Sequence, residues 1–298
     1  MIYTVTLNPA IDYVVQLPSP LQAGAINRTA SEDFQFGGKG INVSVVLQTL
    51  GVPTTALGFI AGFTGKALEE GLQSAGLSTH FFQVQEGMTR INVKIKGSEE
   101  TEINGSGPVI TEENMQALYN LLKQLKKGDT LVLSGSIPKC LPADTYEKIL
   151  SRIPAEDVQT VVDATGQLLV RTLSYAPFLI KPNDHELGEI FGVYPETEQQ
   201  IADYAQRLQA MGARNVLVSL AEKGALLLDE NGTFHRSPCP AGQVVNSVGA
   251  GDSMVAGFLA GYRQTGDYEK ALQLGIAAGS ATAFSLGLAT REQIEALL

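Results

Sequence analysis

Runs of apolar, β-favouring residues alternate with helical patterns along most of the chain. Six such runs are predicted strands: 2–7, 55–60, 129–135, 160–164, 178–183 and 215–220. Their apolar character is nearly continuous, which is typical of parallel strands that helices cover on both faces. Between them, residues 41–50 and 111–129 have helical patterns. The alternation predicts an α/β fold with a doubly wound, mostly parallel sheet and helices on both of its faces.

The longer helical stretch, residues 111–129, carries signals for both of its ends. Thr111 is a good N-cap residue, because its hydroxyl can accept a hydrogen bond from the first turn. Asn114 stands three residues later, where a capping box has Glu or Gln, so a complete box is not predicted. Gly128 is the predicted stop, since glycine favours the left-handed conformation that follows a helix.

Three stretches depart from this rhythm because their polar and apolar residues alternate. They are residues 12–16, 26–36 and 90–104. Alternation is typical of half-exposed strands, which we expect to be antiparallel, with KGSEE (96–100) as a hairpin turn. Such strands do not fit a buried parallel sheet, so they predict a small accessory sheet, here termed the lid. We therefore expect one domain over residues 1–298 with a discontinuous lid.

The composition narrows the classes of protein. Of 298 residues, 44% are hydrophobic, enough for a large core, and the net charge is −10. Such a chain has no positive field to follow a phosphate backbone or an anionic bilayer, so we expect no nucleic-acid or membrane partner. It has no apolar run of about 18 residues and no basic start typical of a signal peptide. Two cysteines, Cys140 and Cys239, fit a reducing compartment and predict a cytoplasmic location.

Two glycine-rich stretches are candidates for chemistry. Residues 249–251 (Gly-Ala-Gly) precede a helical pattern and are followed by Asp252. A helix N-terminus suits an anion, and a fixed carboxylate there repels one unless it acts beside it. A structural turn with Asp as N-cap is the alternative. Residues 37–42 (GGKGIN) combine a permissive backbone with the ammonium of Lys39 and the amide of Asn42; a tight turn is again the alternative.

Two common nucleotide-binding motifs are incomplete. A P-loop requires Ser or Thr after Gly-Lys, but Gly65-Lys66 is followed by Ala67. A dinucleotide fingerprint requires a third glycine, and Met254 stands in its place after Gly249 and Gly251. A nicotinamide-dependent oxidoreductase is therefore a weaker alternative from another class of enzyme.

Several motifs together resemble those of the ribokinase/PfkB family of carbohydrate kinases. They are TLNPAID (6–12), GGKGIN (37–42), SGSIP (134–138), KPNDHE (181–186), VSLAEKGA (218–225) and GAGD (249–252). ALGFIAGFTG (56–65) and TRINVKIK (89–96) are similar to its 1-phosphofructokinase branch, which has tagatose-6-phosphate kinases as close relatives. The chain departs from the family at Asn246, where Asp is usual, and at Ala221, where relatives often have Gly. The resemblance implies a ribokinase-like fold.

The resemblance also implies catalytic roles for the GAGD stretch. Asp252 would be the base that takes the proton of the attacking sugar hydroxyl. The amides of Gly249, Ala250 and Gly251 would form an anion hole for the charge that develops on the transferring phosphoryl group. These roles agree with the physics of phosphoryl transfer, which is mainly positioning and charge stabilisation.

Further residues would bind the sugar phosphate. Asp12 follows the first strand and would bind sugar hydroxyls, and Arg90 would hold the phosphate already present with its guanidinium. The other candidates are Gly38, Lys39, Asn42 and, more weakly, Arg28. Both Asp12 and Arg90 have an ordinary surface role as the alternative.

A separate set of residues would bind the nucleotide. Asn183 and Glu186 lie on one face of a predicted helix, and the family uses this pair around Mg²⁺ and the ATP phosphates. Glu186 would act on the metal through water, since Mg²⁺ keeps several waters; an alternative is that Asp184 and Glu186 simply stabilise the helix dipole. The rest of the nucleotide site would be Ser219, Gly224, Ser247, Gly249 and Gly251. Small residues in 275–283 would approach adenine or serve helix packing.

The implied reaction is ATP- and Mg²⁺-dependent phosphorylation of fructose 1-phosphate at its 6-hydroxyl, which gives fructose 1,6-bisphosphate. The alternative acceptor is tagatose 6-phosphate, which would bind in the opposite sense. A non-catalytic sugar-phosphate sensor is an alternative of a different class. Exposed lid strands leave an edge to be covered, so we expect a homodimer that pairs through the lid.

Overall fold

The computed structural model describes residues 1–154 and 158–298, and its centre is a nine-stranded sheet in the order β13-β12-β11-β10-β9-β8-β1-β4-β5. Its parallel strands are β1 (Ile2–Thr6), β4 (Thr54–Ala61), β5 (Thr79–Val84), β8 (Thr130–Ser134), β9 (Gln159–Asp163), β10 (Leu179–Ile180) and β11 (Asn215–Ser219). The antiparallel strands β12 (Ala225–Leu228) and β13 (Phe234–Ser237) complete one edge. All six predicted strands are confirmed, whereas β5, β12 and β13 were not predicted.

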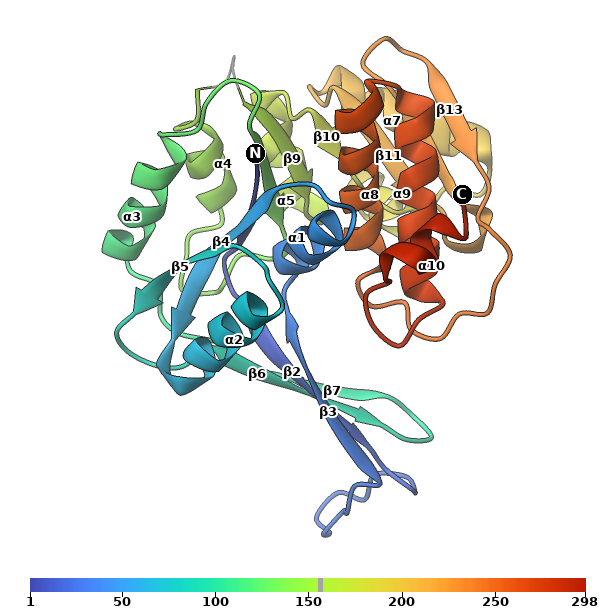
Figure 1. Ribbon diagram of the computed structural model, residues 1–298. Coiled ribbons are helices and arrows are strands. Elements are labelled where there is room, and N and C mark those ends of the chain that lie inside the picture. The colour runs from blue at the N-terminus through green and yellow to red at the C-terminus, as the bar shows by residue number, and fades with distance from the viewer. Residues whose placement is uncertain (155–157) are drawn as a thin grey trace.

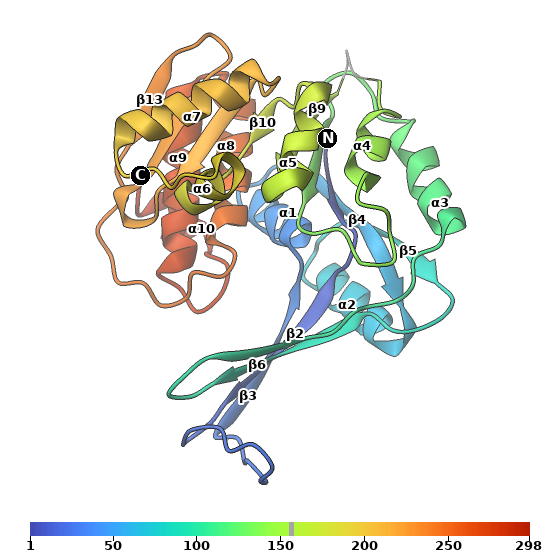
Figure 2. The ribbon, with the colours of Figure 1, turned by 180° about the vertical axis from the view of Figure 1, so that it is seen from behind.

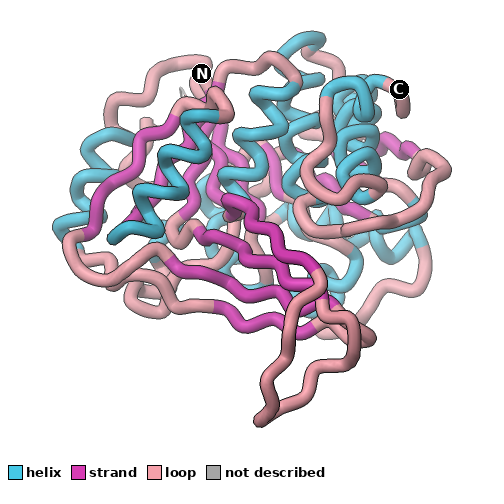
Figure 3. Tube along the Cα trace, turned by 60° about the horizontal axis from the view of Figure 1, so that its bottom comes forward, coloured by secondary structure: helices cyan, strands magenta, loops and turns pink. Residues whose placement is uncertain are grey.

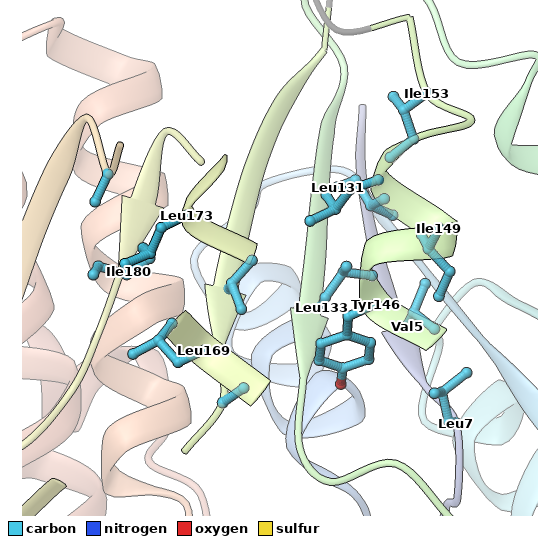
Figure 4. Packing of buried hydrophobic residues seen from close by; sticks show 14 of the residues in the cluster. Val5, Leu7, Leu131, Leu133, Tyr146, Ile149, Ile153, Leu169, Leu173 and Ile180 are labelled. Carbon is cyan, nitrogen blue, oxygen red and sulfur yellow. The ribbon is translucent and has the colours of Figure 1, made fainter. Parts of the chain in front are cut away.

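Helices cover both faces of this sheet, as expected (Figures 1 and 2). One face packs against α3 (Glu112–Leu122), α4 (Thr145–Leu150), α5 (Gly166–Thr172), α6 (Asp184–Phe191) and α7 (Glu198–Ala210). The other packs against α1 (Lys39–Thr49), α8 (Ala250–Thr265), α9 (Tyr268–Ala283) and α10 (Arg291–Glu295). Strand β8 has apolar residues on both of its faces. Leu131 and Leu133 face the first core beside Tyr146 (Figure 4), and Val132, which points the opposite way, belongs to the second core.

A separate four-stranded sheet forms the lid and projects from the main domain (Figures 1 and 3). Its strands, in the order β3-β2-β6-β7, are β2 (Ala10–Gln16), β3 (Ser31–Gly37), β6 (Arg90–Lys96) and β7 (Thr101–Asn104). At its base, Ile11 and Phe36 pack on a buried cluster that includes Leu68 of α2 (Gly62–Ser74). Phe36 lies over Gly71, where a side chain would clash with its ring.

Two expectations about the lid were wrong. The central strands β2 and β6 are parallel, because a long crossover through α1, β4, α2 and β5 joins the lid's two halves instead of a hairpin. Residues 26–30 belong to an exposed loop and not to β3. The outer pairs β2–β3 and β6–β7 are antiparallel, and β6 and β7 flank the predicted turn.

The helix α3 begins where it was predicted but differs from the prediction in its capping box and in its end. Thr111 caps it as expected, but Asn114 completes the capping box: its Oδ1 accepts a 2.9 Å hydrogen bond from the backbone N–H of Thr111. The helix ends at Leu122 rather than near Gly128, since tighter three-residue turns follow it. Within the described ranges 1–154 and 158–298, no helix combines the length and apolar character needed to cross a bilayer.

Candidate active site

Polar residues gather at the carboxyl edge of the central sheet. Neighbouring parallel strands end here: Ser134 closes β8 opposite Asp163 of β9, and Lys181 follows β10 directly. The lid also rises from this edge, because β1 leads into β2 and β3 ends at the start of α1. The carboxyl edge of an open α/β sheet is where such folds bind ligands.

Asp252 lies in the first turn of α8 and is buried, with 5% of its surface exposed. The side-chain amide of Asn42, from α1, donates a 2.8 Å hydrogen bond to its Oδ2. Burial and the negative charge of Asp163 raise the pKa of Asp252 to about 7, although Asn42 and two lysines act in the opposite direction. A carboxylate with this pKa is suited to act as a general base at neutral pH.

The turn before Asp252 leaves the start of α8 open. Gly249 is the N-cap, with a φ of 81° that glycine adopts without strain, and no side chain caps the helix among the described residues. The N–H of Ala250 donates to the carbonyl of Ser247 at 3.2 Å. The next N–H groups of a helix start have no acceptor within the helix, so this turn can bind an anion beside Asp252.

A buried carboxylate, Asp163, joins two lysines next to this turn. Its Oδ2 lies 3.3 Å from the ammonium of Lys39, and its Oδ1 lies 3.3 Å from that of Lys181. Burial acts to raise the pKa of Asp163, but the two lysines outweigh it and hold the pKa below its usual value. Burial acts to lower the pKa of Lys39, but Asp163, Asp252 and Glu186 outweigh it, so the pKa of Lys39 is raised.

The GGKGIN stretch serves both as a tight turn and as part of the site. Gly38 (φ 134°) and Gly40 pack against Thr6 at the end of β1, where any side chain would collide with the Thr6 side chain. Thr6 Oγ1 accepts a 3.1 Å hydrogen bond from the N–H of Ile41. The turn therefore presents Lys39 to Asp163 and Asn42 to Asp252. Lys39 was a candidate for the sugar phosphate together with Arg90; in the structure its ammonium contacts Asp163.

The lid presents a polar face formed by β2 and β6. Asp12 stands opposite Asn92, whose amide donates a 2.8 Å hydrogen bond to Asp12 Oδ1, and Lys94 lies 3.7 Å from Asp12 Oδ2. Arg90 shares this face and donates from Nε to the carbonyl of Asn8 at 3.1 Å. Asn92 and Lys94 were missed from the sequence, although the two-residue period of a strand places them beside Arg90.

Three of the predicted nucleotide residues lie where β10 and β11 end, at the carboxyl edge of the sheet. Asn183 and Glu186 form a reciprocal capping box at the start of α6, with bonds of 2.7 and 2.9 Å. A parallel bridge places Asn183 beside Ser219. The negative charge of Glu186 also helps to raise the pKa of Lys39, so the Glu186 carboxylate interacts electrostatically with that lysine. The pair thus caps α6, a structural role other than the dipole stabilisation by Asp184 and Glu186 that was the alternative.

Three other predicted residues have different surroundings. Gly224 (φ 89°) packs on the carbonyl of Ser237 where no side chain fits. Ser247 is exposed before the α8 turn. Arg28 lies in the exposed residues 18–30, a loop at the far end of the lid, and is not brought to the carboxyl edge of the sheet (Figures 1 and 3). Gly279 packs close to the Ala250 carbonyl, which is a helix-packing role within the 275–283 stretch, whereas Ile276 and Ala277 of the same stretch line a cavity.

The doubly wound sheet with its lid has the ribokinase-like fold, since it superposes on the structure of Arabidopsis thaliana ribokinase with a TM-score of 0.80 at 22% identity, covering 99% of this chain and 97% of that one. The family model of the pfkB family carbohydrate kinases matches residues 5–294. The chain belongs to the pfkB family of carbohydrate kinases.

Curated relatives and solved structures agree with this family. The chain is 46% identical to a 1-phosphofructokinase of Bacillus subtilis over 298 residues, covering 100% of this chain and 97% of the relative. It is 41% identical to a D-tagatose-1-phosphate kinase of Bacillus licheniformis, covering 97% and 94%. The structure of phosphofructokinase-2 from Escherichia coli in complex with fructose-6-phosphate superposes with a TM-score of 0.91 at 26% identity, covering 99% of this chain and 97% of that one.

Proposed function

We propose that this protein transfers the γ-phosphoryl group of ATP to the 6-hydroxyl of fructose 1-phosphate, giving fructose 1,6-bisphosphate and ADP. The observation that carries the proposal is Asp252, a buried carboxylate with a pKa of about 7 beside an open helix start. A base and an anion site in contact are what attack by a hydroxyl on a phosphoryl group requires. The 46% identical relative named 1-phosphofructokinase supports the choice of acceptor.

The chemistry would use the residues as follows. Asp252 takes the proton of the attacking hydroxyl, while Asn42 fixes the orientation of its carboxylate through the 2.8 Å hydrogen bond. The amides of the 249–251 turn stabilise the charge on the transferring group. Lys39 lies beside these groups, so we assign it to the transferring phosphoryl group rather than to the acceptor phosphate.

The acceptor would bind between the carboxyl edge and the polar face of the lid. Asp12, held by Asn92 and Lys94, offers its carboxylate to sugar hydroxyls. Arg90 donates one hydrogen bond from Nε to the carbonyl of Asn8, and the other N–H groups of its guanidinium would bind the 1-phosphate. Gly38 would bring backbone close to the sugar.

The nucleotide would lie along Ser219, Gly224 and Ser247. A cavity of about 370 Å³ lies next to Gly224, between the segment after β13 and helix α9. Its lining includes Pro238, Cys239, Ile276 and Ala277. A space of this size, lined by proline and aliphatic side chains together with the polar residues Ser237 and Gln273, is suited to a purine ring, which supports placing adenine there.

Glu186 would hold Mg²⁺ through water. Its Oε2 accepts the bond that closes the capping box, which leaves Oε1 for a hydrated ion. Mg²⁺ favours oxygen ligands and keeps several waters, so one carboxylate near the ATP phosphates fits it. When bound, the ion would neutralise charge on the phosphates.

We also propose a homodimer that pairs through the lid, in the cytoplasm. One row across the lid's four strands consists of Phe34, Tyr13, Val93 and Ile103, in register. This row lies on the face opposite Asp12, and 59% of both Phe34 and Ile103 is exposed. Exposed apolar rows on a sheet are suited to pairing. Sedimentation velocity should give a dimer, and Phe34→Glu should shift it to monomer.

A tagatose phosphate is the second candidate acceptor, because a relative at 41% identity is named D-tagatose-1-phosphate kinase. That name puts the phosphate on carbon 1, as in fructose 1-phosphate, whereas the sequence alternative was tagatose 6-phosphate. The comparisons give no support to a non-catalytic sensor.

A coupled ADP-release assay tests which sugar phosphate is the preferred acceptor. We expect kcat/KM for fructose 1-phosphate to exceed those for tagatose 1-phosphate, tagatose 6-phosphate, fructose 6-phosphate and free fructose. A higher value for any of these would contradict the proposal.

A further inference from the structure

All four strands of the lid contribute to the surroundings of one carboxylate, that of Asp12 on β2. On β6, the side-chain amide of Asn92 donates a 2.8 Å hydrogen bond to Asp12 Oδ1, and Lys94 lies 3.7 Å from Oδ2. Lys94 lies at the same distance from Glu102 of β7. At the end of β3, a Cβ built on Gly37 would be 2.9 Å from Asp12 Oδ2, so a side chain there would displace the carboxylate.

Asn92 fixes this carboxylate most directly, because both ends of its own side chain are engaged. It is 7% exposed. Its Oδ1 accepts a 3.2 Å hydrogen bond from the backbone N–H of Gly105, and its Nδ2 donates to Asp12. A flipped amide would place its NH₂ group against the N–H of Gly105 and its oxygen against the carboxylate, so one orientation alone satisfies both partners.

The segment that follows β7 holds Asn92 in turn. Gly105 packs so closely on β6 that an added Cβ would lie 2.9 Å from the carbonyl oxygen of Ile91. The next residue is fastened to the connection between β1 and β2, because Asn8 Nδ2 donates a 3.0 Å hydrogen bond to the carbonyl of Ser106. These contacts keep the N–H of Gly105 within reach of Asn92.

A carboxylate held in this way accepts hydrogen bonds from a limited set of directions. A mobile side chain can follow a hydroxyl into either configuration, whereas a fixed one loses its bond to an inverted hydroxyl. A polar group of the site that is left unpaired is costly, so such a site rejects the wrong sugar. In the ring form of a ketohexose 1-phosphate, the free hydroxyls whose configuration differs between sugars are those on carbons 3 and 4.

We propose that Asn92 is a positioning residue that orients Asp12 toward the ring hydroxyls of the acceptor, and that the fixed carboxylate selects fructose 1-phosphate over its epimers at carbons 3 and 4. The inference rests on the reaction proposed above and on the sugar-binding role of Asp12. Asn92 acts through Asp12 and takes no part in the proton transfer, which belongs to Asp252.

A double-mutant cycle tests whether Asn92 acts through Asp12. It compares kcat/KM for fructose 1-phosphate in the wild type, Asn92→Ala, Asp12→Ala and the double variant. Loss of a hydrogen bond to a charged group corresponds to about ten- to over a hundredfold, so Asn92→Ala should lower kcat/KM by about tenfold or more. Added to Asp12→Ala, the same change should cost less than about threefold.

Two controls accompany the cycle. KM for ATP should stay within about threefold of the wild type in Asn92→Ala, because the lid contact is with the acceptor. Asn120→Ala removes the same side chain from an exposed position on α3 and should match the wild type on both substrates.

Selectivity is the second readout. Tagatose 1-phosphate is the epimer of fructose 1-phosphate at carbon 4, and allulose 1-phosphate is its epimer at carbon 3. The ratio of kcat/KM for fructose 1-phosphate to that for an epimer should fall by about tenfold in Asn92→Ala for at least one of the two.

A second variant shows whether a lost effect on folding explains the result. Asn92→Asp has the same shape and can still accept the hydrogen bond from Gly105, but its carboxylate cannot donate to Asp12. Its far-UV circular dichroism should match that of the wild type, while its kcat/KM for fructose 1-phosphate should fall at least as far as in Asn92→Ala.

The outcomes separate this inference from the proposed function. The inference is overturned if both Asn92 variants stay within about threefold of the wild type, if Asn92→Ala costs the same factor with and without Asp12, or if neither epimer ratio falls. Each of these results leaves the kinase reaction standing. A wild-type protein that transfers no phosphoryl group to any sugar phosphate contradicts the proposed function itself.

Discussion

Asp252→Asn should lower activity and change how stability depends on pH. The amide keeps the size of the carboxyl group and can still accept the bond from Asn42, but it neither titrates nor acts as a base. A positioned general base contributes about 10²–10⁴ in rate, so kcat should fall by that factor. The affinity for ATP should stay within a few-fold, because the residue faces the acceptor hydroxyl.

The stability change follows from the pKa of about 7 in the folded state against the ordinary value of 3.8. Between these values the folded protein holds a proton that the unfolded chain has released. Each unit of rising pH therefore lowers the free energy of unfolding by about 1.4 kcal/mol, and above pH 7 the dependence ends. Between pH 5 and pH 8, titration of this residue should therefore lower the free energy of unfolding by up to about 3 kcal/mol, because only the two pH units below pH 7 contribute.

Urea unfolding at pH 5 and pH 8 measures this directly. The loss of unfolding free energy between the two pH values should be about 1–3 kcal/mol smaller in Asp252→Asn than in wild type. The comparison is a double difference, so the contributions of titrating groups that do not interact with Asp252 cancel, and the coupling of Asp252 to Asp163 and Lys39 is part of the measured difference. Equal pH dependence in both proteins, or a variant that keeps more than half of the wild-type kcat, would refute the reasoning.

Three further predictions follow from individual contacts. Glu186→Gln should raise the Mg²⁺ concentration needed for half-maximal activity, because a neutral amide is a weaker partner for the hydrated ion; an unchanged Mg²⁺ titration would leave Glu186 as a helix cap only. Arg90→Ala should raise KM for fructose 1-phosphate about ten- to a hundredfold and hardly change kcat/KM for free fructose, whereas equal losses on both sugars would remove Arg90 from the phosphate site. Asn42→Ala should shift the acid limb of kcat/KM to higher pH, since its hydrogen bond lowers the pKa of Asp252; a shift to lower pH would contradict that role.

Most of the central sheet could be predicted because its parallel strands are buried on both faces and read as continuous apolar runs. The hairpin of β12 and β13 was missed, although Asn231-Gly232 is a good turn signal between its strands. The parallel pairing of β2 and β6 could not be predicted, because 73 residues separate Gln16 from Arg90 and local alternation does not reveal which strand a segment joins. The order of strands depends on the tertiary crossover.

In the site too, some residues have a local sequence signal and others depend on the tertiary fold. The GAGD and GGKGIN stretches have local signals, namely glycines at a helix start, and the structure brings them together through Asn42 and Asp252. Asp163 lies in no motif, and Lys181 opens the KPNDHE motif (181–186) but was given no role. Each stands at the carboxyl end of an apolar run, which was an unused signal. Lys39 faces Asp163 and not Arg90 because of the way α1 packs on β1. No local sequence pattern predicts this packing.

Phosphorus NMR of one reaction mixture tests the kinase mechanism most directly. Wild-type protein, ATP, Mg²⁺ and fructose 1-phosphate should give the two resonances of fructose 1,6-bisphosphate together with ADP. Asp252→Asn at the same concentration should give at most about a hundredth of that rate. Wild-type protein that leaves fructose 1-phosphate unchanged, or a variant that forms the bisphosphate at the wild-type rate, would contradict the proposed reaction and its base.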